Sequence, residues 1–225
     1  MNRSRIIELT ELHDRLGVFA DRADAGEVLA GMLRALVSRK PLVLAIPAGG
    51  VPVAAPVALR LGCPLDVAVV SKITLPWNSE AGYGAVAFDN TVRLNHELAT
   101  RRALSPEQIE TGIRATREKV QRRVKLFRGE RPLPAVADRT VILVDDGLAS
   151  GFTMLVAVEA LRNLGADNLV VAVPTGHDHA LALVAPLVDA LYCANVRSGW
   201  SFAVAEAYRQ WSDVDEEQVR RLLQA

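Results

Sequence analysis

Apolar residues follow two patterns along the chain. Short continuous apolar runs are typical of strands covered on both faces, and apolar residues three and four positions apart are typical of helices. The continuous runs predict strands at residues 42–46, 65–70, 141–144, 169–173 and 190–194. The helical spacing predicts helices at residues 6–16, 25–37, 51–61, 106–127, 152–164, 180–187 and 214–223. Ser105 and either Asp21 or Asp24 are the expected N-terminal caps of two of these helices.

The order of these elements predicts the fold class. Strands and helices alternate, which favours an open, mainly parallel twisted sheet with helices on both faces. Residues 85–94 differ, because they predict an antiparallel hairpin that turns at Asp89-Asn90. We expect one α/β domain over residues 1–225. Its expected parts are N-terminal helices, an α/β core, a flap within that core and a C-terminal tail or hood, at residues 1–40, 41–195, about 73–95 and 196–225.

Composition and charge narrow the functional classes. The chain has 225 residues and is 50% hydrophobic, which is enough to bury a substantial core. Twenty-six basic and twenty-six acidic residues cancel, so no basic excess supports binding to nucleic acid phosphates. Neither a secretory signal nor an apolar run of membrane-spanning length is present, and we expect a cytoplasmic protein without membrane contact. Cys63 and Cys193 stand far apart and are expected to be reduced thiols.

One stretch combines acidic side chains with a turn of small residues. In VILVDDGLASGFTM, residues 141–154, Asp145 and Asp146 directly follow a predicted buried strand. Ligands of parallel sheets bind beyond the carboxyl ends of the strands. The turn that follows opens a helix, and its successive N–H groups form an anion site to which Ser150 and Thr153 can add hydroxyl donors. A phosphate on this turn beside two carboxylates predicts a sugar phosphate whose hydroxyls donate to the aspartates.

Other interpretations of the same stretch exist. A carboxylate that ends a strand can simply cap the following helix, and turns of small residues are common. The lysine and the GxxxxGK[ST] spacing of a P-loop are missing, and so is the G-x-G-x-x-G of a dinucleotide-binding turn. The prediction of a sugar-phosphate site therefore depends on the ordered combination of strand, Asp-Asp, turn and helix, and not on any single residue.

Residues 141–153 resemble the 5-phosphoribosyl-1-pyrophosphate (PRPP) binding motif of type I phosphoribosyltransferases. IPAGGVPVA at 46–54 lies where that family has its pyrophosphate loop, and residues 71–95 lie where it has a mobile flap. A bacterial and archaeal subgroup of predicted phosphoribosyltransferases is also similar at FADRADAGEVL, residues 19–29, and at GAVA, residues 84–87. The resemblance thus extends over nearly the whole chain. It implies Mg²⁺-dependent transfer of phosphoribose from PRPP to a nitrogenous base, or the reverse pyrophosphorolysis, in nucleotide synthesis or salvage.

The resemblance also implies roles for individual residues. Asp145 and Asp146 would hold the ribose 2- and 3-hydroxyls, and one of them would contact Mg²⁺ directly or indirectly. The pyrophosphate loop would contain a non-proline cis peptide bond, and Lys72 would approach the same pyrophosphate. The residues that would present backbone N–H groups to the pyrophosphate are Ala48, Gly49 and Gly50. The residues that would hold the 5-phosphate are Ala149, Ser150, Gly151, Phe152 and Thr153.

The chain departs from the family at Ala48, where relatives usually carry arginine or lysine. A cation there would stabilise the leaving pyrophosphate. Lys72, Arg93, Mg²⁺ or a basic residue of a partner subunit would have to compensate. A regulatory module that binds PRPP or a nucleotide with little or no turnover therefore stays an alternative, and an unrelated nucleotide-binding α/β enzyme is a third.

The acceptor site is the least defined part of the prediction. In this family it is a hood built from variable segments, and here the C-terminal tail carries several aromatic residues that can stack on a nucleobase or pack the tail onto the core. Trp200 and Phe202 are the candidates for contact with the base. A homodimer is expected from the resemblance. His177 and His179 lack a further ligand of a metal site. The basic residues of 108–131 fit a solvated helix face, with an RNA or dimer contact as the alternative.

Overall fold

The centre of the molecule is a six-stranded sheet with the strand order β1-β9-β8-β7-β2-β3. The structure is a computed structural model that describes residues 6–224, without the side chains of Ser79 and Glu80. Every neighbouring pair in this sheet is parallel, so the carboxyl ends of the strands meet at one edge. The strands are β1 (Ile6–Ile7), β2 (Leu42–Ala45), β3 (Leu65–Val67), β7 (Thr140–Val144), β8 (Asn168–His177) and β9 (Ala190–Arg197). The predicted open parallel sheet is confirmed.

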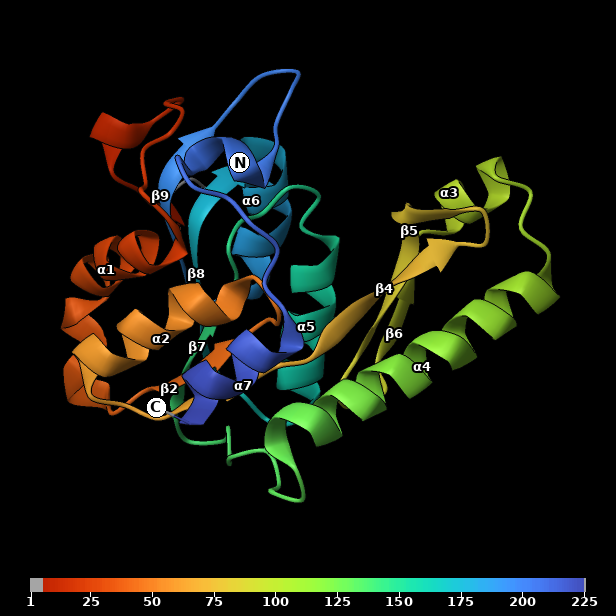
Figure 1. The fold of residues 1–225 in the computed structure, drawn as a ribbon, viewed down its shortest axis with the longest axis horizontal. Coiled ribbons are helices and arrows are strands. Elements are labelled where there is room, and N and C mark those ends of the chain that lie inside the picture. The colour runs from red at the N-terminus through yellow and green to blue at the C-terminus, as the bar shows by residue number, and fades with distance from the viewer. Residues whose placement is uncertain (1–5, 225) are drawn as a thin grey trace.

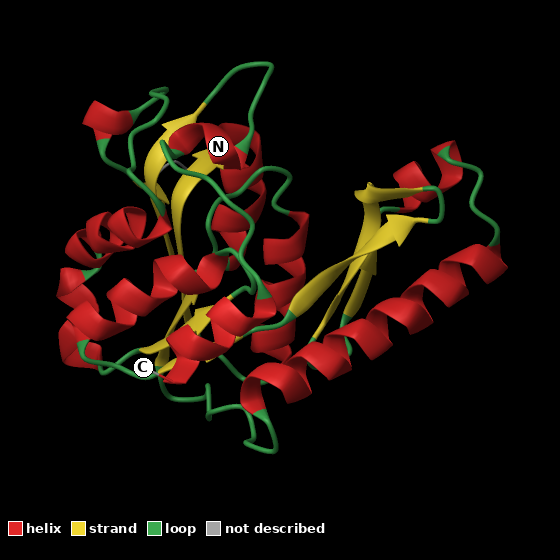
Figure 2. Cartoon of the chain, viewed as in Figure 1, coloured by secondary structure: helices red, strands yellow, loops and turns green. Residues whose placement is uncertain are grey.

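Helices cover both faces of this sheet (Figures 1 and 2). Side chains alternate along each strand, so Ile142 and Val144 of β7 pack into one apolar layer while Val141 and Leu143 pack into the other. The first layer is covered by α1 (Arg22–Met32), α2 (Gly50–Leu61) and α7 (Glu216–Gln224). The second layer is covered by α5 (Phe152–Asn163) and α6 (Asp178–Val184). This double coverage explains why the strands are continuous apolar runs.

A second, three-stranded antiparallel sheet projects from the core (Figure 1). It consists of β4 (Val70–Leu75), β5 (Asn78–Ala87) and β6 (Val92–Leu94), and it lies along the long helix α4 (Pro106–Arg128) with the short helix α3 (His96–Arg101) at its far end. The predicted hairpin is confirmed, with Asn90 in the left-handed conformation at its turn (φ 74°). The predicted flap thus has its own sheet and a supporting helix.

The long helix α4 is fixed at both ends. At its start, Ser105 Oγ accepts from the Gln108 N–H and the Gln108 side chain accepts from the Ser105 N–H, which forms a capping box. At its end, Arg128 Nε pairs with Asp66 Oδ1 at 3.3 Å, and Arg128 Nη2 donates to Val67 O at 2.6 Å. This buried contact ties the flap's support to β3 of the main sheet.

Two predictions for the elements were wrong. Residues 6–16 do not form a helix: Ile6–Ile7 is an edge strand beside β9, and a 3-10 helix follows at Thr10–Leu12. The buried Asn195 side chain donates to the Leu12 and Arg15 carbonyls and thereby holds this segment in a non-helical path. The predicted strand at 65–70 is divided, because β3 ends at Val67 and the chain enters the second sheet at Val70.

The remaining predicted elements are present with shifted ends. Helix α1 begins at Arg22 with Asp21 as its cap and ends at Met32, before a 3-10 helix at Arg34–Arg39. Shorter 3-10 helices lie at Ala185–Leu187 and Val204–Ala207. Within residues 6–224, no helix combines the length and the apolar character that crossing a bilayer requires. Cys63 and Cys193 are free thiols, and burial raises the pKa of both.

Candidate functional site

The predicted site residues meet where β2 and β7 end side by side. Ala45 pairs with Val144 in the parallel register, so the chain leaves both strands at the same edge of the sheet. The Ile46 N–H continues the ladder by donating to Val144 O at 2.8 Å. The loop after β2 and the aspartates after β7 are therefore neighbours, although about a hundred residues separate them in the sequence.

The loop after β2 lies directly against the two aspartates. A Cβ atom at Gly50 would be 2.8 Å from Val144 O and 3.0 Å from the Asp145 Cα, and a Cβ atom at Gly49 would overlap the Asp146 carboxylate. At Gly50 the neighbouring atoms are backbone, so only glycine permits this approach, whereas at Gly49 a larger residue would have to displace the Asp146 side chain. The peptide bond between Pro47 and Ala48 is cis, which the resemblance implies for this loop.

The backbone amides of the loop differ in their availability. The Gly50 N–H is engaged, because it donates to Ile46 O at 3.0 Å as α2 begins. Among the described residues, the N–H groups of Ala48 and Gly49 donate to no acceptor of the chain. An anion at this loop would therefore meet two free amides rather than the three that the sequence predicts.

The two aspartates are largely buried and unequally partnered. Asp145 Oδ1 accepts from the Asp146 N–H at 2.9 Å, whereas Asp146 Oδ2 accepts from Arg22 Nε at 2.9 Å. Burial and the neighbouring Asp146 carboxylate raise the pKa of Asp145 well above its usual value, against the opposing charges of Lys72 and Arg22. Burial also raises the pKa of Asp146, and the Arg22 contact opposes it. Hydroxyl donors or a cation would relieve this crowding of negative charge.

The turn after the aspartates is fixed to the neighbouring strand and open to solvent. The Leu148 N–H donates to Thr175 O at 3.0 Å, and Leu148 O accepts from the His177 N–H at 2.9 Å. Ala149 and Ser150 are exposed. Gly151 has φ 73° and is the N-cap of α5. This left-handed conformation explains the glycine, since it turns the chain sharply into the helix.

The amides of this turn form a set of hydrogen-bond donors. Ser150 Oγ accepts from the Phe152 N–H at 3.4 Å. Within residues 6–224, the N–H groups of Ala149, Ser150, Gly151 and Thr153 have no acceptor. They lie at the positive end of α5, so the turn has the geometry of an anion site at a helix N-terminus.

Lys72 approaches the aspartates from the flap. It lies on β4, is exposed, and runs past Gly82 of the neighbouring strand β5, where a Cβ atom would be 3.3 Å from the Lys72 Cβ. Its charge lowers the pKa of Asp145. The structure thus brings Lys72 into electrostatic range of Asp145, without a direct ion pair to either aspartate in the described chain. Its expected approach to a pyrophosphate stays a prediction.

The C-terminal tail reaches the site through residues other than the predicted base contacts. Tyr208 is buried, and its hydroxyl donates to Asp146 O at 2.6 Å. Trp211 stacks on the Arg22 guanidinium, with 3.8 Å between the guanidinium carbon and the ring centroid. Trp200 is fully exposed, and the Phe202 ring packs edge-on against His177 at 5.7 Å.

Arg22 contacts the candidate site in a way that the sequence does not reveal. The segment FADRADAGEVL carries a resemblance to relatives, but nothing in it indicates that Arg22 reaches an aspartate 124 positions away. Tyr208 is likewise one of several tail aromatics in the sequence. The one signal in the sequence is that residues 19–29 resemble those of relatives, and this resemblance assigns no role to Arg22.

The site fits a divalent cation only together with a substrate. Within the described part of the chain, no group of three or more His, Cys, Asp or Glu side chains is arranged to hold a metal ion. Asp145 and Asp146 supply two hard carboxylates. Mg²⁺ is commonly bound by one or two carboxylates together with substrate phosphates, so this donor set fits Mg²⁺ that arrives with a phosphorylated ligand.

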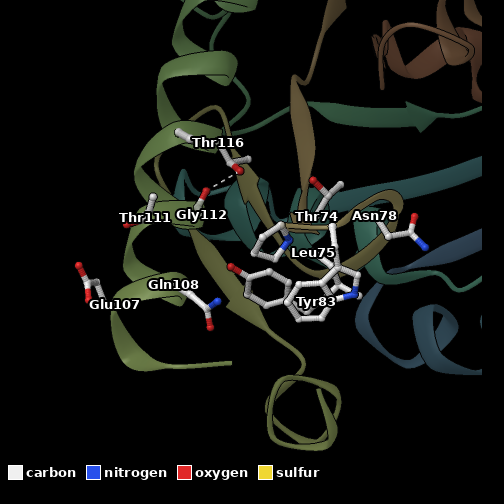
Figure 3. A pocket seen from close by; sticks show the side chains of 12 residues that line it. Thr74, Leu75, Asn78, Tyr83, Glu107, Gln108, Thr111, Gly112 and Thr116 are labelled. Atoms are coloured by element: carbon white, nitrogen blue, oxygen red, sulfur yellow. Dashed lines mark hydrogen bonds between the residues drawn. The ribbon is translucent and has the colours of Figure 1, made fainter. Parts of the chain in front are cut away.

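A cavity of about 630 Å³ lies apart from these residues (Figure 3). It is formed by the turn between β4 and β5 and by the first turns of α4, with Trp77, Tyr83 and Gln108 among its lining residues. No predicted site residue belongs to its lining. The candidate site therefore lies at the edge of the main sheet where the carboxyl ends of the strands meet, here called the rim, and not in this cavity.

Known proteins resemble the chain over most of its length. A family model described as the phosphoribosyl transferase domain matches residues 22–207. Proteins of two Mycobacterium tuberculosis strains, named provisionally as phosphoribosyl transferases, are 36% identical over 202 residues. These matches cover 90% of this chain and 45% of each relative, so the chain spans just under half their length. The crystal structure of the protein TT1426 from Thermus thermophilus is 34% identical with a TM-score of 0.71, covering 91% of this chain and 97% of that one. The chain belongs to the phosphoribosyl transferase family.

Proposed function

We propose that this chain transfers phosphoribose from PRPP to a nitrogenous base with release of pyrophosphate, or catalyses the reverse reaction. The observation that carries the proposal is the meeting of three elements at one edge of the sheet: two largely buried aspartates, a turn with free amides, and the loop after β2, residues 47–50, which we call the glycine loop. Each element suits a different part of PRPP. The family membership supports phosphoribosyl transfer in general, while the acceptor and the metal belong to the proposal.

Each part of PRPP has a proposed place. The 5-phosphate binds the amides of the 149–153 turn, where the helix N-terminus favours negative charge. The ribose 2- and 3-hydroxyls donate to Asp145 and Asp146, which replaces part of the hydration that burial removes from these carboxylates. The pyrophosphate lies against the amides of Ala48 and Gly49, within reach of Lys72 on the flap.

The reaction requires positioning more than covalent chemistry from the protein. The bond between C1 of ribose and the pyrophosphate oxygen breaks, its electron pair leaves with pyrophosphate, and the nitrogen lone pair of the base forms the new bond. The turn and the aspartates hold the sugar so that C1 faces the acceptor. The flap excludes water, which would otherwise capture the positively charged sugar. Mg²⁺, held by Asp145 or Asp146 and the substrate, would supply positive charge to the pyrophosphate.

The acceptor site is proposed to lie under the tail. Two observations support this placement: Phe202 packs against His177 at the carboxyl end of β8, and Trp200 is fully exposed in the loop after β9, where its flat face is free to stack on a base. We also propose a homodimer in the cytoplasm that serves nucleotide synthesis or salvage. A change of Phe202 should alter the preference among bases without altering PRPP affinity.

A second candidate is a regulatory module that binds PRPP or a nucleotide without turnover. One observation favours it: the loop from Ile46 to Pro52 carries no charged side chain that would stabilise the leaving pyrophosphate. Both candidate functions use the same PRPP-binding pocket, and they differ only in whether the bound PRPP reacts. A regulator should bind PRPP tightly and leave it intact.

The test is release of pyrophosphate from PRPP and Mg²⁺ with a panel of purines and pyrimidines. Transfer predicts release with at least one base, and loss of that release in the double variant Asp145→Asn, Asp146→Asn. Tight binding of PRPP by calorimetry without release would favour the regulator. If PRPP neither binds nor reacts, both candidates are wrong.

A further inference from the structure

Arg22 is held in the site by three separate contacts. It is the first residue of α1, and its side chain is only 11% exposed. Its Nε donates to Asp146 Oδ2 at 2.9 Å, its Nη1 donates to Ser212 O at 2.8 Å, and its guanidinium stacks on the Trp211 ring. The guanidinium is thereby fixed in place between Asp146 of the core and the C-terminal tail.

The position of this guanidinium relative to the glycine loop follows from one oxygen atom. Asp146 Oδ2 accepts the Arg22 hydrogen bond, and the same oxygen is the atom that a Cβ at Gly49 would overlap. Arg22 and Gly49 therefore touch the same carboxylate oxygen. The guanidinium and the Gly49 backbone thus flank the same Asp146 carboxylate, which places Arg22 next to the glycine loop.

The charges of the site show why a cation is needed at this point. The glycine loop has no charged side chain, and it adjoins two carboxylates. Lys72 and Arg22 are the cations whose charges act on Asp145. A pyrophosphate on this loop is repelled by the two carboxylates, and fixed positive charge next to the loop offsets that repulsion.

We propose that Arg22 is a pyrophosphate-binding residue that supplies the charge missing from the glycine loop. In the ligand-free protein Arg22 neutralises Asp146. When PRPP is bound, the ribose hydroxyls donate to Asp146, and a pyrophosphate oxygen placed beside the fixed guanidinium accepts the Arg22 Nε–H in place of the carboxylate. The inference rests on the proposed function, because it assumes that the loop holds pyrophosphate.

The remaining contacts of Arg22 allow this exchange without displacement of the side chain. The stack on Trp211 and the bond to Ser212 O do not involve Asp146, so they hold the guanidinium while its Nε changes acceptor. Arginine suits this task because its planar group keeps several donors in a fixed arrangement and stays charged at every physiological pH.

The experiment compares two ligands that occupy different halves of the site. Inorganic pyrophosphate with Mg²⁺ and ribose 5-phosphate are titrated separately by calorimetry into the wild type and Arg22→Gln. We expect the variant to bind pyrophosphate about tenfold more weakly, or about 1.4 kcal/mol. Its affinity for ribose 5-phosphate should stay equal or increase, because Asp146 no longer has a competing partner.

Two further variants separate charge from structure. Arg22→Lys keeps the charge, so its pyrophosphate affinity should stay within about threefold of the wild-type value. This change is well below the loss of about tenfold, or about 1.4 kcal/mol, expected for Arg22→Gln. Arg209→Gln is the matched control, since Arg209 is exposed and also links the tail to the N-terminal segment through Gly17 O, without contact to Asp146. It should bind both ligands as the wild type does.

Three outcomes would decide against the inference or its basis. Wild-type pyrophosphate affinity in Arg22→Gln would overturn it. An equal loss of affinity for both ligands in Arg22→Gln, or in Arg22→Lys if the glutamine variant does not fold, would assign Arg22 a purely structural role. If the wild type itself binds neither ligand, the proposed function fails, which is distinguishable from failure of the Arg22 inference alone.

Discussion

At the scale of single residues, the site holds negative charge where burial disfavours it. Asp145 is largely buried beside Asp146, and of the two only Asp146 forms a hydrogen bond with an arginine. The pKa of Asp145 is raised because its ionised form loses hydration and is repelled by its neighbour. Binding sites commonly lower the stability of the free protein in this way, since their groups await a ligand.

Asp145→Asn should therefore stabilise the ligand-free protein at neutral pH, by about 1 kcal/mol or more. The asparagine oxygen can still accept from the Asp146 N–H, so the change removes charge and little else. Because the folded pKa of Asp145 lies above its unfolded value, the wild type loses stability as the pH rises between these two values. The stability difference should be small at acid pH, below the unfolded pKa, and should grow as the pH rises toward the folded pKa of Asp145.

Denaturant unfolding of both proteins without divalent cations would measure this difference. The same variant should bind ribose 5-phosphate more weakly, because it lacks the carboxylate proposed to accept ribose hydroxyls. A variant that is less stable than the wild type at pH 7 would contradict the electrostatic explanation.

The glycine loop provides a second test at a single position. Gly49→Ala places a methyl group onto the Asp146 carboxylate, so the loop or the aspartate must move. We expect a loss of about 1–3 kcal/mol in stability and a clear loss of pyrophosphate binding.

Gly31→Ala is the matched control for the glycine loop. Gly31 lies in α1 with no atom within 4 Å of an added Cβ, so alanine should raise stability by up to about 1 kcal/mol through helix propensity and leave binding unchanged. Equal behaviour of the two variants in both unfolding and calorimetry would argue against close contact between Gly49 and Asp146.

At the scale of elements, local signals in the sequence predict most of the architecture. The buried strands β2, β7, β8 and β9 appear as apolar runs, and Ser105 and Asp21 mark helix starts through their capping chemistry. The edge strand β1 was missed because two residues carry no periodicity and depend on pairing with β9. The break between β3 and β4 was missed because an apolar run does not indicate which sheet it joins.

The site shows the same division between local and distant information. The aspartates, the turn and the glycine loop lie at the predicted rim, because the ends of parallel strands must meet there. The contacts of Arg22 and Tyr208 to Asp146 were not predictable, since they depend on how the two ends of the chain pack onto the core. The Gly50 amide was wrongly expected to be free, because it closes the first turn of α2.

The link between α4 and the main sheet is an element-scale test. Arg128 and Asp66 are buried, with side chains 5% and 8% exposed, so Arg128→Met leaves an unpaired buried carboxylate. We expect a loss of about 3–5 kcal/mol in the free energy of unfolding, part of which Arg128→Met with Asp66→Leu should restore.

The exposed pair of Arg60 and Glu27 is the matched control for this link. It has a shorter distance of 2.7 Å, but its side chains are 65% and 43% exposed. Arg60→Met should cost no more than about 1 kcal/mol, because solvent screens the pair. Similar losses in the free energy of unfolding for Arg128→Met and Arg60→Met, measured by denaturant, would show that burial does not determine how much an ion pair contributes to stability.

At the scale of the whole molecule, the site is assembled from every part of the chain. The N-terminal segment contributes Arg22, the core contributes the aspartates and the turn, the flap contributes Lys72, and the tail contributes Tyr208. The N-terminal segment and the tail are also hydrogen-bonded to each other, because the Arg209 N–H donates to Phe19 O and the Gln210 N–H donates to Ala20 O. Ligand binding should therefore stabilise the packing of both ends and the flap together.

A crystal structure of the protein soaked with PRPP and Mg²⁺ tests the proposed site most directly. We expect the 5-phosphate on the amides of the 149–153 turn and the ribose hydroxyls on Asp145 and Asp146. The pyrophosphate should lie on the loop at Gly49. PRPP bound elsewhere, or a soaked crystal in which this rim stays without ligand while another part of the protein holds the sugar phosphate, would contradict the assignment.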